Sequence, residues 1–433
     1  MNVIAKEMNE VLSKNAPVLF SMLSDFGKRI FMPKGIIVQS AEAKQQAKKY
    51  NATIGIAREN DEPMFLPSLK KYFNELKSAD IFDYAPGFGN PDLRTKWKKK
   101  IIAENPSLKS IDDISSPVVT CGLTHGITLV ADMFVDENDE IIIPDKLWEN
   151  YNLILEERYK AKVVNYSLFN DSLTGFDTKA LDRVLNVSKK EKIILLFNFP
   201  NNPTGYTPTK TEVNEIFNIV TKYADLGKKI LVVCDDAYYG LLYEKDLLEG
   251  SIFSRFANSH KNIVAIKIDG VSKEDYSWGL RIGFITFSVS NPNADIYKVL
   301  ESKVAAAIRC SISNCSQVAQ SIFAKVLGDP SYNEEKKQKY EILKKRAQKT
   351  KEVVYSPKYK EFWDVYPFNS GYFMCLKLKG ANAEELRQYA LKQYQVGTIV
   401  LGDDLRVAFS SVELEQIEDL FNILANCVKE LRK

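Results

Sequence analysis

Short apolar runs alternate with longer amphipathic segments through the middle of the chain. Seven runs rich in β-branched or aromatic residues predict strands, at residues 117–120, 140–143, 163–166, 193–197, 230–234, 263–268 and 282–287. Helical periodicity lies between them, at residues 124–134, 148–158, 210–226 and 248–258. This alternation predicts an α/β fold with a mostly parallel sheet. Because such sheets bind ligands at the carboxyl ends of their strands, we expect chemistry just after each apolar run.

The two ends of the chain follow a different pattern. The first 15 residues space their apolar positions as an amphipathic helix does. After residue 310, the pattern predicts helices at 332–354, 383–394 and 413–431 and strands at 371–378 and 405–409. This α+β pattern indicates a second, smaller domain. We therefore expect a large domain over residues 65–310, a small domain over residues 311–433, and an N-terminal segment over residues 1–64 that joins the small domain.

Composition and charge narrow the class of protein. The 433 residues include 59 Lys and Arg against 56 Asp and Glu, a net charge of +3. Such a balance does not favour an electrostatically driven nucleic-acid or membrane-binding protein. The chain is 45% hydrophobic and 27% charged, as expected of a soluble protein with a large core. No apolar run approaches the roughly 18 residues that a membrane helix needs, and the N-terminus lacks the continuous apolar stretch of a signal peptide.

Cysteines and histidines limit the chemistry further. Six cysteines are scattered without a C-x-x-C pair, and three of them lie inside apolar runs. Free thiols in a reducing cytosol are therefore expected. The chain has only two histidines, His125 and His260. We expect no His-rich metal site, and a Ser–His or Cys–His nucleophile would need one of these two residues.

Three successive predicted strands end in polar residues. NFPNNPTG (198–205) breaks its strand with two prolines and a glycine, a pattern that a plain tight turn would also explain. CDDAYYG (234–240) places two carboxylates and two tyrosines at the next strand end. In KIDGVSKEDYSWGLRIGF (267–284), Lys273 lies in a turn and Arg281 follows eight positions later. Each motif alone could be structural, but their succession at neighbouring strand ends indicates a shared site.

Together these motifs resemble the fold-type I pyridoxal-phosphate enzymes, specifically the class I/II aminotransferases that include aspartate and aromatic amino acid transaminases. The resemblance runs from about Ile54 to Arg406. It implies a seven-stranded, mostly parallel sheet in the large domain and pyridoxal 5′-phosphate as the cofactor. It also implies that Lys273 forms a Schiff base with the cofactor aldehyde and moves a proton between the substrate Cα and the cofactor.

The resemblance assigns several residues to the cofactor ring. Asp235 matches the carboxylate that keeps the pyridine nitrogen protonated, which makes the ring a better electron sink. Asp236 is a competing assignment, but the spacing to Tyr238 favours Asp235. Tyr238 and Asn202 match residues that hydrogen-bond the ring oxygen, and Asn202 also matches a substrate-carboxylate contact. Trp148, in PDKLWENY (144–151), matches the aromatic residue that stacks on the ring, although a lone tryptophan could equally be core.

The cofactor phosphate needs hydrogen-bond donors. TCGLTHGI (120–127) begins a predicted helix directly after a strand, so its backbone N–H groups can bind an anion, although helix capping alone would explain it. The resemblance implies a phosphate site there at Gly122, Leu123 and Thr124. Arg281 matches the phosphate arginine. Gly270 departs from the pattern, because relatives often have serine there; Ser272 is expected to point away along an extended segment.

Four residues match substrate and subunit contacts. Arg406, in DLRVAFS (404–410), matches the arginine that binds the substrate α-carboxylate, and Gly55 matches the N-terminal loop that closes over substrate. Tyr84, in YAPGFGNPDLR (84–94), matches the tyrosine that reaches the neighbouring subunit's phosphate. Arg309, in IRCSISN (308–314), matches an arginine from the partner subunit that binds a distal carboxylate. The resemblance therefore implies a homodimer with shared active sites.

These residues predict a cytoplasmic aminotransferase that reacts an amino acid with a 2-oxo acid by a ping-pong route. The expected donors are aspartate or glutamate, aromatic amino acids, or both, with 2-oxoglutarate as acceptor. A β-lyase or a decarboxylase on the same scaffold remains an alternative, because scaffold does not dictate reaction. A transaminase for alanine or other neutral amino acids is a further alternative. A cofactor-sensing regulatory module is disfavoured by the intact Lys273 and by the lack of an added DNA-binding segment.

Overall fold

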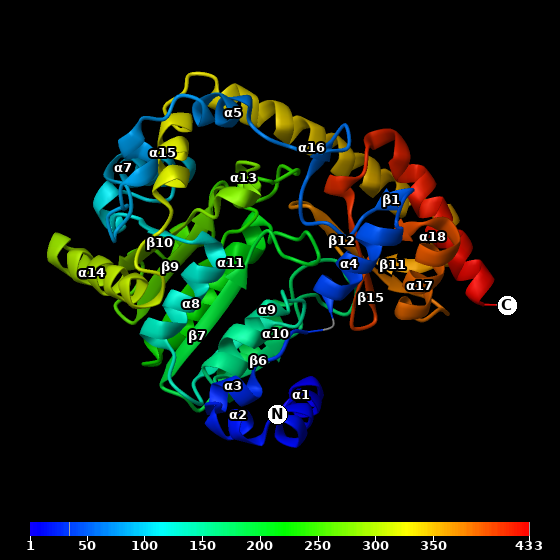
Figure 1. Cartoon of the computed structure of the whole chain (residues 1–433), viewed down its shortest axis with the longest axis horizontal. Helices are drawn as coiled ribbons and strands as arrows, with labels where there is room; N and C mark the ends of the chain where they lie inside the picture. The colour runs from blue at the N-terminus through cyan, green and yellow to red at the C-terminus, as the bar shows by residue number, and fades with distance from the viewer. Residues whose placement is uncertain (34, 433) are drawn as a thin grey trace.

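A seven-stranded sheet forms the centre of the computed structural model, which describes residues 1–33 and 35–432 (Figure 1). Its strand order is β4-β10-β9-β8-β7-β5-β6. The strands are β4 Val118–Thr120, β5 Glu140–Pro144, β6 Lys162–Tyr166, β7 Lys192–Asn198, β8 Lys229–Asp235, β9 Ile263–Gly270 and β10 Gly283–Val289. Only β10 runs antiparallel to its neighbours β4 and β9. All seven predicted strands and the mostly parallel sheet are therefore confirmed.

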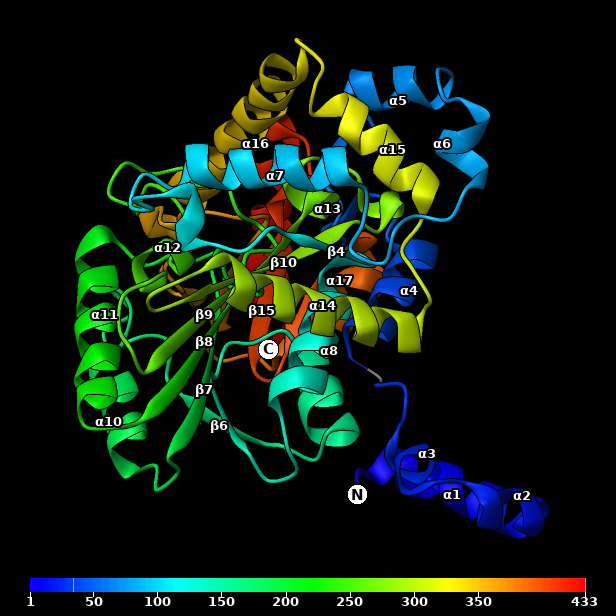
Figure 2. The same ribbon diagram turned by 90° about the vertical axis from the view of Figure 1, so that its left-hand side faces the viewer.

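Helices cover this sheet because its central strands are apolar on both faces. In β7 and β8 every residue after the first is buried, as expected of a parallel sheet between helical layers. Helix α8 (Gly122–Phe134) packs on β9 and β10, whereas α11 (Lys210–Asp225) packs on β8 and on α10 (Thr178–Val187). Figure 2 shows α10 and α11 on one side of the strands and α8 with α14 (Ala294–Ser311) on the other.

Two predicted helices differ from the structure. The predicted helix at 148–158 is a short α9 (Asn150–Asn152) that continues as a π-helix, Leu153–Arg158. The helix predicted at 248–258 was wrong for most of its length, because only α12 (Phe253–Phe256) is helical. Gly250 has φ +109°, and the backbone N–H of Ser251 donates to Asn105 Oδ1 at 2.7 Å. These local contacts hold residues 250 and 251 in a turn that the apolar spacing did not reveal.

A four-stranded antiparallel sheet forms the centre of a second, α+β unit. Its order is β11-β12-β15-β14, with β11 Trp363–Val365, β12 Phe373–Leu378, β14 Ile399–Leu401 and β15 Asp404–Ala408. The helices of this unit are α16 Tyr332–Val354, α17 Ala383–Tyr394 and α18 Ile417–Leu431. Chain from the N-terminal part joins it, because β1 (Tyr50–Asn51) pairs with β13 (Val396–Gly397) and α4 (Ile36–Gln46) packs on β13 and β14. The exact division at residues 64 and 310 stays a prediction.

The first helices of the chain form a group that projects from the body of the molecule in Figure 2, with the segment Asp25–Arg29 against the π-helix Leu153–Arg158. Helices α1 (Val3–Asn15), α2 (Pro17–Met22) and α3 (Asp25–Arg29) follow one another there, and the Arg29 guanidinium donates to the Glu157 carbonyl at 3.0–3.1 Å. Three more helices, α5 (Pro67–Phe73), α6 (Ser78–Phe82) and α7 (Pro91–Glu104), pack against α15 (Gln317–Val326). Within residues 1–33 and 35–432, no helix combines the length and the apolar character needed to cross a bilayer.

Candidate active site

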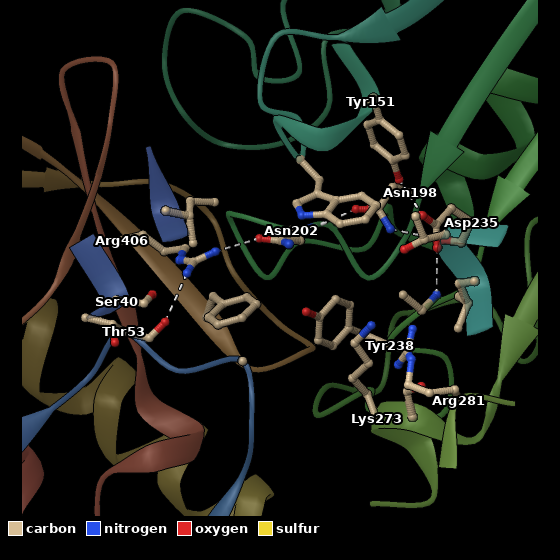
Figure 3. Close-up of a pocket in the computed structure, with 18 residues that line it drawn as sticks. Ser40, Thr53, Tyr151, Asn198, Asn202, Asp235, Tyr238, Lys273, Arg281 and Arg406 are labelled. Carbon is tan, nitrogen blue, oxygen red and sulfur yellow. Dashed lines mark hydrogen bonds between the residues drawn. The ribbon is translucent and has the colours of Figure 1, made fainter. Parts of the chain in front are cut away.

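A cavity of about 310 Å³ lies where β7 and β8 end, facing β12 and β15 of the second unit (Figure 3). Its lining comes from both ends and the middle of the chain: Ile36, Ser40, Thr53, Gly55, Leu123, Thr124, Trp148, Tyr151, Asn198, Asn202, Asp235, Ala237, Tyr238, Ser272, Lys273, Arg281, Phe373 and Arg406. Every predicted site residue except Gly122, Tyr84 and Arg309 lies in this lining. The structure thus brings together residues more than 350 positions apart, such as Gly55 and Arg406.

Lys273 extends into the cavity from a single helical turn, α13 (Val271–Glu274), directly after β9. Its carbonyl oxygen accepts a hydrogen bond from the Tyr372 hydroxyl at 2.8 Å, which fixes the backbone at this point. Its Nζ lies 5.3 Å from the centre of the Tyr238 ring. Burial lowers the pKa of Lys273, while the Asp235 carboxylate opposes this shift and Arg281 adds to it. A lysine with a lowered pKa is more often neutral and therefore more nucleophilic.

Asp235 ends β8 and is buried, and two donors hold its carboxylate. The backbone N–H of Ala237 donates to Oδ1 at 3.0 Å, and the Tyr151 hydroxyl donates to Oδ2. Burial raises the pKa of Asp235, whereas the hydrogen bond from Tyr151 and the charge of Lys273 lower it. The neighbouring Asp236 forms a buried ion pair with Lys267 and does not line the cavity. The geometry therefore favours Asp235 over Asp236 as the carboxylate of this site.

The N-terminus of α8 and Arg281 form an anion cradle at one end of the cavity. Gly122 has φ +75°, and a Cβ placed there would lie 2.4 Å from Arg281 Nη2, so glycine lets the guanidinium lie against the helix start. Leu123 and Thr124 follow it in the lining. The N-cap residue of this helix, Cys121, makes no side-chain hydrogen bond to the helix end, and His125 Nδ1 accepts from the backbone N–H of Cys121 at 3.1 Å. The first N–H groups of α8 are therefore available to an anion, next to a guanidinium of matching geometry.

The side chain of Ser272 lies elsewhere than predicted, and the structure explains why position 270 is a glycine. The prediction that Ser272 points away was wrong, because residues 271–274 form a helical turn and not an extended segment. Ser272 lines the cavity, and its buried hydroxyl has no hydrogen-bond partner among the described residues. At Gly270 a Cβ would lie 2.5 Å from the Ile282 carbonyl oxygen, so serine does not fit there. The unpartnered Ser272 hydroxyl lies in the same turn and can supply an anion donor in its place.

Arg406 lies at the opposite side of the cavity, on β15. Its Nη1 donates to Asn202 Oδ1 at 3.0 Å and its Nη2 donates to the Thr53 carbonyl at 3.1 Å (Figure 3). The buried Nε has no partner, and no carboxylate pairs with this guanidinium within the described part of the chain. Burial lowers the pKa of Arg406, but a guanidinium remains protonated at neutral pH. Arg406 is therefore a buried cation with capacity to bind a substrate carboxylate.

Tyr84 and Arg309 lie outside the cavity of their own chain. Tyr84 is 87% exposed. Arg309 is an exposed residue near the end of α14, where its Nη1 donates to Ser313 Oγ at 2.6 Å. Neither residue contributes to this site within one chain.

Comparison with known proteins identifies the family. The family described as aminotransferase class I and II matches residues 48–424. The chain belongs to this family. A curated relative named probable aspartate aminotransferase, from Methanocaldococcus jannaschii, is 27% identical over 205 residues, which is 47% of this chain and 49% of the relative. The mitochondrial aspartate aminotransferase of Schizosaccharomyces pombe is 25% identical over 303 residues, 69% of this chain and 67% of that protein.

A solved structure shows the same fold over nearly the whole chain. The aminotransferase from Anaerococcus prevotii superposes with a TM-score of 0.82 at 24% sequence identity, covering 95% of this chain and 100% of that one. The aligned part of the chain therefore spans about half the length of the M. jannaschii relative and the whole length of the solved structure. The predicted fold type is confirmed by this likeness.

Class I and II aminotransferases depend on pyridoxal phosphate, and the cavity has groups that suit this cofactor. The uncapped N-terminus of α8, Arg281 and the unpartnered Ser272 hydroxyl match the charge and donor needs of a phosphate. The same cavity is lined by a half-buried lysine, Lys273, and a buried carboxylate, Asp235. Both are types of residue that the cofactor's aldehyde and ring nitrogen require.

Several lining residues were missed from the sequence. Tyr151 ends the quoted motif PDKLWENY, three residues after Trp148, and this spacing on a helical turn could have indicated it. Asn198 begins NFPNNPTG; its side chain donates to the Asp235 carbonyl at 3.0 Å and accepts from the backbone N–H of Asn202 at 2.8 Å. Thr53 begins TIGIAREN (53–60), the segment that contains Gly55, and this position next to Gly55 could have indicated it; Ser40 carries no motif, and only the folded structure brings it to the cavity.

Proposed function

We propose that the protein is a pyridoxal-phosphate-dependent aminotransferase that exchanges the amino group of an amino acid with a 2-oxo acid. The observation that supports this best is the arrangement at one cavity of Lys273, Asp235 and Arg406. They provide an amine of lowered pKa, a buried carboxylate and a buried cation with an unpartnered N–H. Transamination needs each of these three groups: a proton carrier, a partner for the ring nitrogen and a binding site for the α-carboxylate.

When bound, pyridoxal phosphate supplies an aldehyde that takes up an amino group and a ring that stabilises negative charge at the substrate Cα. Its phosphate would be held by the N-terminus of α8 with Arg281 and Ser272, and its ring nitrogen by Asp235. Tyr151 keeps the Asp235 carboxylate in place by donating to Oδ2. Because Asp235 is buried, its negative charge acts at short range with little screening by water.

Arg406 and Lys273 carry out the steps on the substrate. Arg406 binds the α-carboxylate, which orients the Cα–H bond toward the lysine. The neutral Lys273 amine accepts the proton from the substrate Cα and then gives it back on the cofactor side of the reacting atoms. The amine is therefore neutral again when the half-reaction ends. The buried position of Arg406 and the half-buried position of Lys273 limit the access of bulk water to the proton transfer. The second half of the reaction reverses these steps on a 2-oxo acid.

Aspartate or glutamate, aromatic amino acids, or both are the proposed donors, with 2-oxoglutarate as acceptor. The relatives named aspartate aminotransferase support the dicarboxylic class. Within this proposal, Arg309 of one chain reaches the cavity of the partner and binds the distal carboxylate. Its place outside its own cavity agrees with such a role in trans.

Arg309→Ala tests this substrate assignment. A bidentate, partly desolvated Arg–carboxylate pair contributes about 2–5 kcal/mol when one partner is truncated. We therefore expect kcat/KM for aspartate and glutamate to fall by roughly 30-fold or more, with much smaller changes for phenylalanine and tyrosine, which have no distal carboxylate. Half-reactions with each donor measure this without interference from the acceptor. Arg406→Ala is the comparison variant, and it should impair all four donors. Equal losses for aspartate and phenylalanine in Arg309→Ala would make Arg309 structural.

The proposed enzyme is a homodimer with shared active sites, and mixed dimers test this. One chain carries Lys273→Ala, and the other carries Tyr84→Phe with Arg309→Ala. If Tyr84 and Arg309 act across the interface, each mixed dimer has one site with both lesions and one intact site. A random mixture should then regain about a quarter of the normal activity, because half of its dimers are mixed. Confirmed subunit exchange without any regained activity would show that the two residues act in cis.

We propose a cytosolic location for this enzyme. The six cysteines are free thiols, and four of them, at 234, 315, 375 and 427, are buried. Free buried thiols are typical of reducing compartments. Fractionation of the cells that produce the protein would test the location, and recovery in a membrane or secreted fraction would contradict it.

A further inference from the structure

Two acidic side chains follow Lys273 in the sequence and point away from the cavity. Glu274 and Asp275 are only 2% and 0% exposed, and neither lines the cavity. Asp236, which follows Asp235, is 2% exposed and shows the same arrangement. Both residues proposed to act on the cofactor are thus followed by carboxylates buried on the other side of the backbone. The proposed mechanism uses none of these three carboxylates.

Glu274 joins two helices to the turn that carries Lys273. Its Oε1 accepts hydrogen bonds from Lys336 Nζ at 2.5 Å and from Lys100 Nζ. Lys100 lies on α7 and Lys336 on α16, so both helices contact α13 through one carboxylate oxygen. Figure 2 shows α7, α13 and α16 on the same side of the molecule. Burial alone would raise the pKa of Glu274, but the two ammonium groups lower it, which keeps the carboxylate ionised.

Asp275 adds a second connection to the same helix. Its Oδ1 accepts a hydrogen bond from the Tyr332 hydroxyl at 2.6 Å, and it lies 3.4 Å from Lys336 Nζ. Tyr332 and Lys336 are one turn apart on α16. Residues 274 and 275 are therefore both held by the first two turns of that helix.

A second ion-pair group lies beside the first, behind Asp235. Lys267 pairs with Asp236 and lies 3.3 Å from Asp269, whose two carboxylate oxygens accept from Trp97 Nε1 at 3.1 Å. The Tyr239 ring connects the groups, because Lys267 Nζ lies 4.5 Å and Lys100 Nζ 5.6 Å from its centre. The buried charges thus form one continuous cluster behind the cavity.

A buried cluster of ion pairs is better explained by the positions that it fixes than by the stability that it adds. Well-packed apolar residues would often stabilise a core as well as buried ion pairs do, so a buried pair is weak evidence for stability. What ion pairs add is a fixed geometry, because each carboxylate must meet its partners. The turn α13 has only four residues, Val271–Glu274, and so short a helical segment does not hold its own conformation. Contacts from outside must fix the backbone that carries Lys273.

We propose that Glu274 and Asp275, held by Lys100, Tyr332 and Lys336, are positioning residues that fix the Lys273 turn against α7 and α16. We call these contacts the anchor. Its role in catalysis rests on the proposed function, since it assumes that Lys273 acts on substrate. The mechanical part, a rigid turn at residues 271–274, does not depend on the reaction.

Glu274→Gln tests the anchor, because it removes the charge and keeps the shape. Glu244→Gln is the matched control: Glu244 pairs with Lys351 on the same helix α16, but this pair is exposed. In the cofactor-loaded protein without substrate, Glu274→Gln should speed hydrogen exchange of the backbone amides in residues 271–277, while Glu244→Gln leaves them unchanged. In the amino half-reaction, kcat should fall by about 10- to 100-fold because the amine is misplaced, and KM for the donor should stay within about twofold.

Two variants at Lys336 keep the test decisive if Glu274→Gln folds poorly. Lys336→Met removes one partner and should reproduce the faster exchange and the lower kcat. Lys336→Arg retains the charge and should restore both toward normal. The proposal is overturned if exchange at residues 271–277 matches the Glu244→Gln control, or if melting temperature falls while kcat stays normal. A chain without any transaminase activity would contradict the proposed function, and the exchange result would still decide whether the anchor exists.

Discussion

Lys273→Ala is expected to lower turnover by about 10⁴-fold, the upper end of what a positioned acid–base group contributes. The loss should be large because Lys273 is the lysine of lowered pKa in the cavity lining, whereas the buried Lys267 on β9 is held by Asp236 and Asp269. Cofactor content should fall much less, since the α8 N-terminus and Arg281 are unchanged. The measurement is steady-state turnover with added pyridoxal phosphate.

Borohydride reduction of the unaltered protein gives the matching chemical result. Peptide mass spectrometry should find the pyridoxyl group on Lys273. Lys261→Ala, a change at an exposed loop lysine, is the control and should retain both the label and the activity. Label on another lysine, or turnover within tenfold of normal in Lys273→Ala, would contradict the assignment.

Asp235→Ala should lower turnover by about 10²–10³-fold, the usual effect of removing one preorganised electrostatic contact. The variant leaves the ring nitrogen without a negative partner and leaves the Tyr151 hydroxyl without its acceptor. The phosphate donors remain, so affinity for the cofactor should change far less than turnover. Cofactor titration and the amino half-reaction measure the two effects separately.

Asp225→Ala controls for the loss of a carboxylate, because Asp225 ends α11 before β8 begins, whereas Asp235 ends β8, and because Asp225 is exposed. It should leave both quantities unchanged. If Asp235→Ala keeps turnover within a few-fold of normal, then Asp236 or another acid holds the ring nitrogen.

The central strands could be predicted because a strand that is buried on both faces needs a continuous run of apolar residues. β7 and β8 are examples, and polar residues appear where each strand ends. Asn202, Asp235 and Lys273 follow such runs, so their meeting at one edge of the sheet follows from parallel topology. The correct elements were those in which local pattern and global burial agree.

Other parts of the fold and site depend on contacts that the local pattern does not encode. The turn at Gly250 depends on Asn105, which lies 145 residues earlier. Ser272 enters the cavity because its segment is helical, which the run of small residues did not indicate. Ser40 and Thr53 reach the site only because the N-terminal part of the chain packs on the second unit. The anchor at Glu274 likewise needs Lys100 and Lys336, from two distant helices.

The reaction itself is tested most directly by a single half-reaction. The cofactor-loaded protein is mixed with L-aspartate or L-phenylalanine and no 2-oxo acid, and products are measured together with the cofactor spectrum. An aminotransferase should release one equivalent of the matching 2-oxo acid per site, convert the cofactor to its amino form and then stop until 2-oxoglutarate is added. Continued release of CO₂ from either donor would instead identify a decarboxylase. Continued release of ammonia with pyruvate from an S-substituted cysteine, which carries the β-leaving group that aspartate and phenylalanine lack, would identify a β-lyase. Either result would contradict the proposed function.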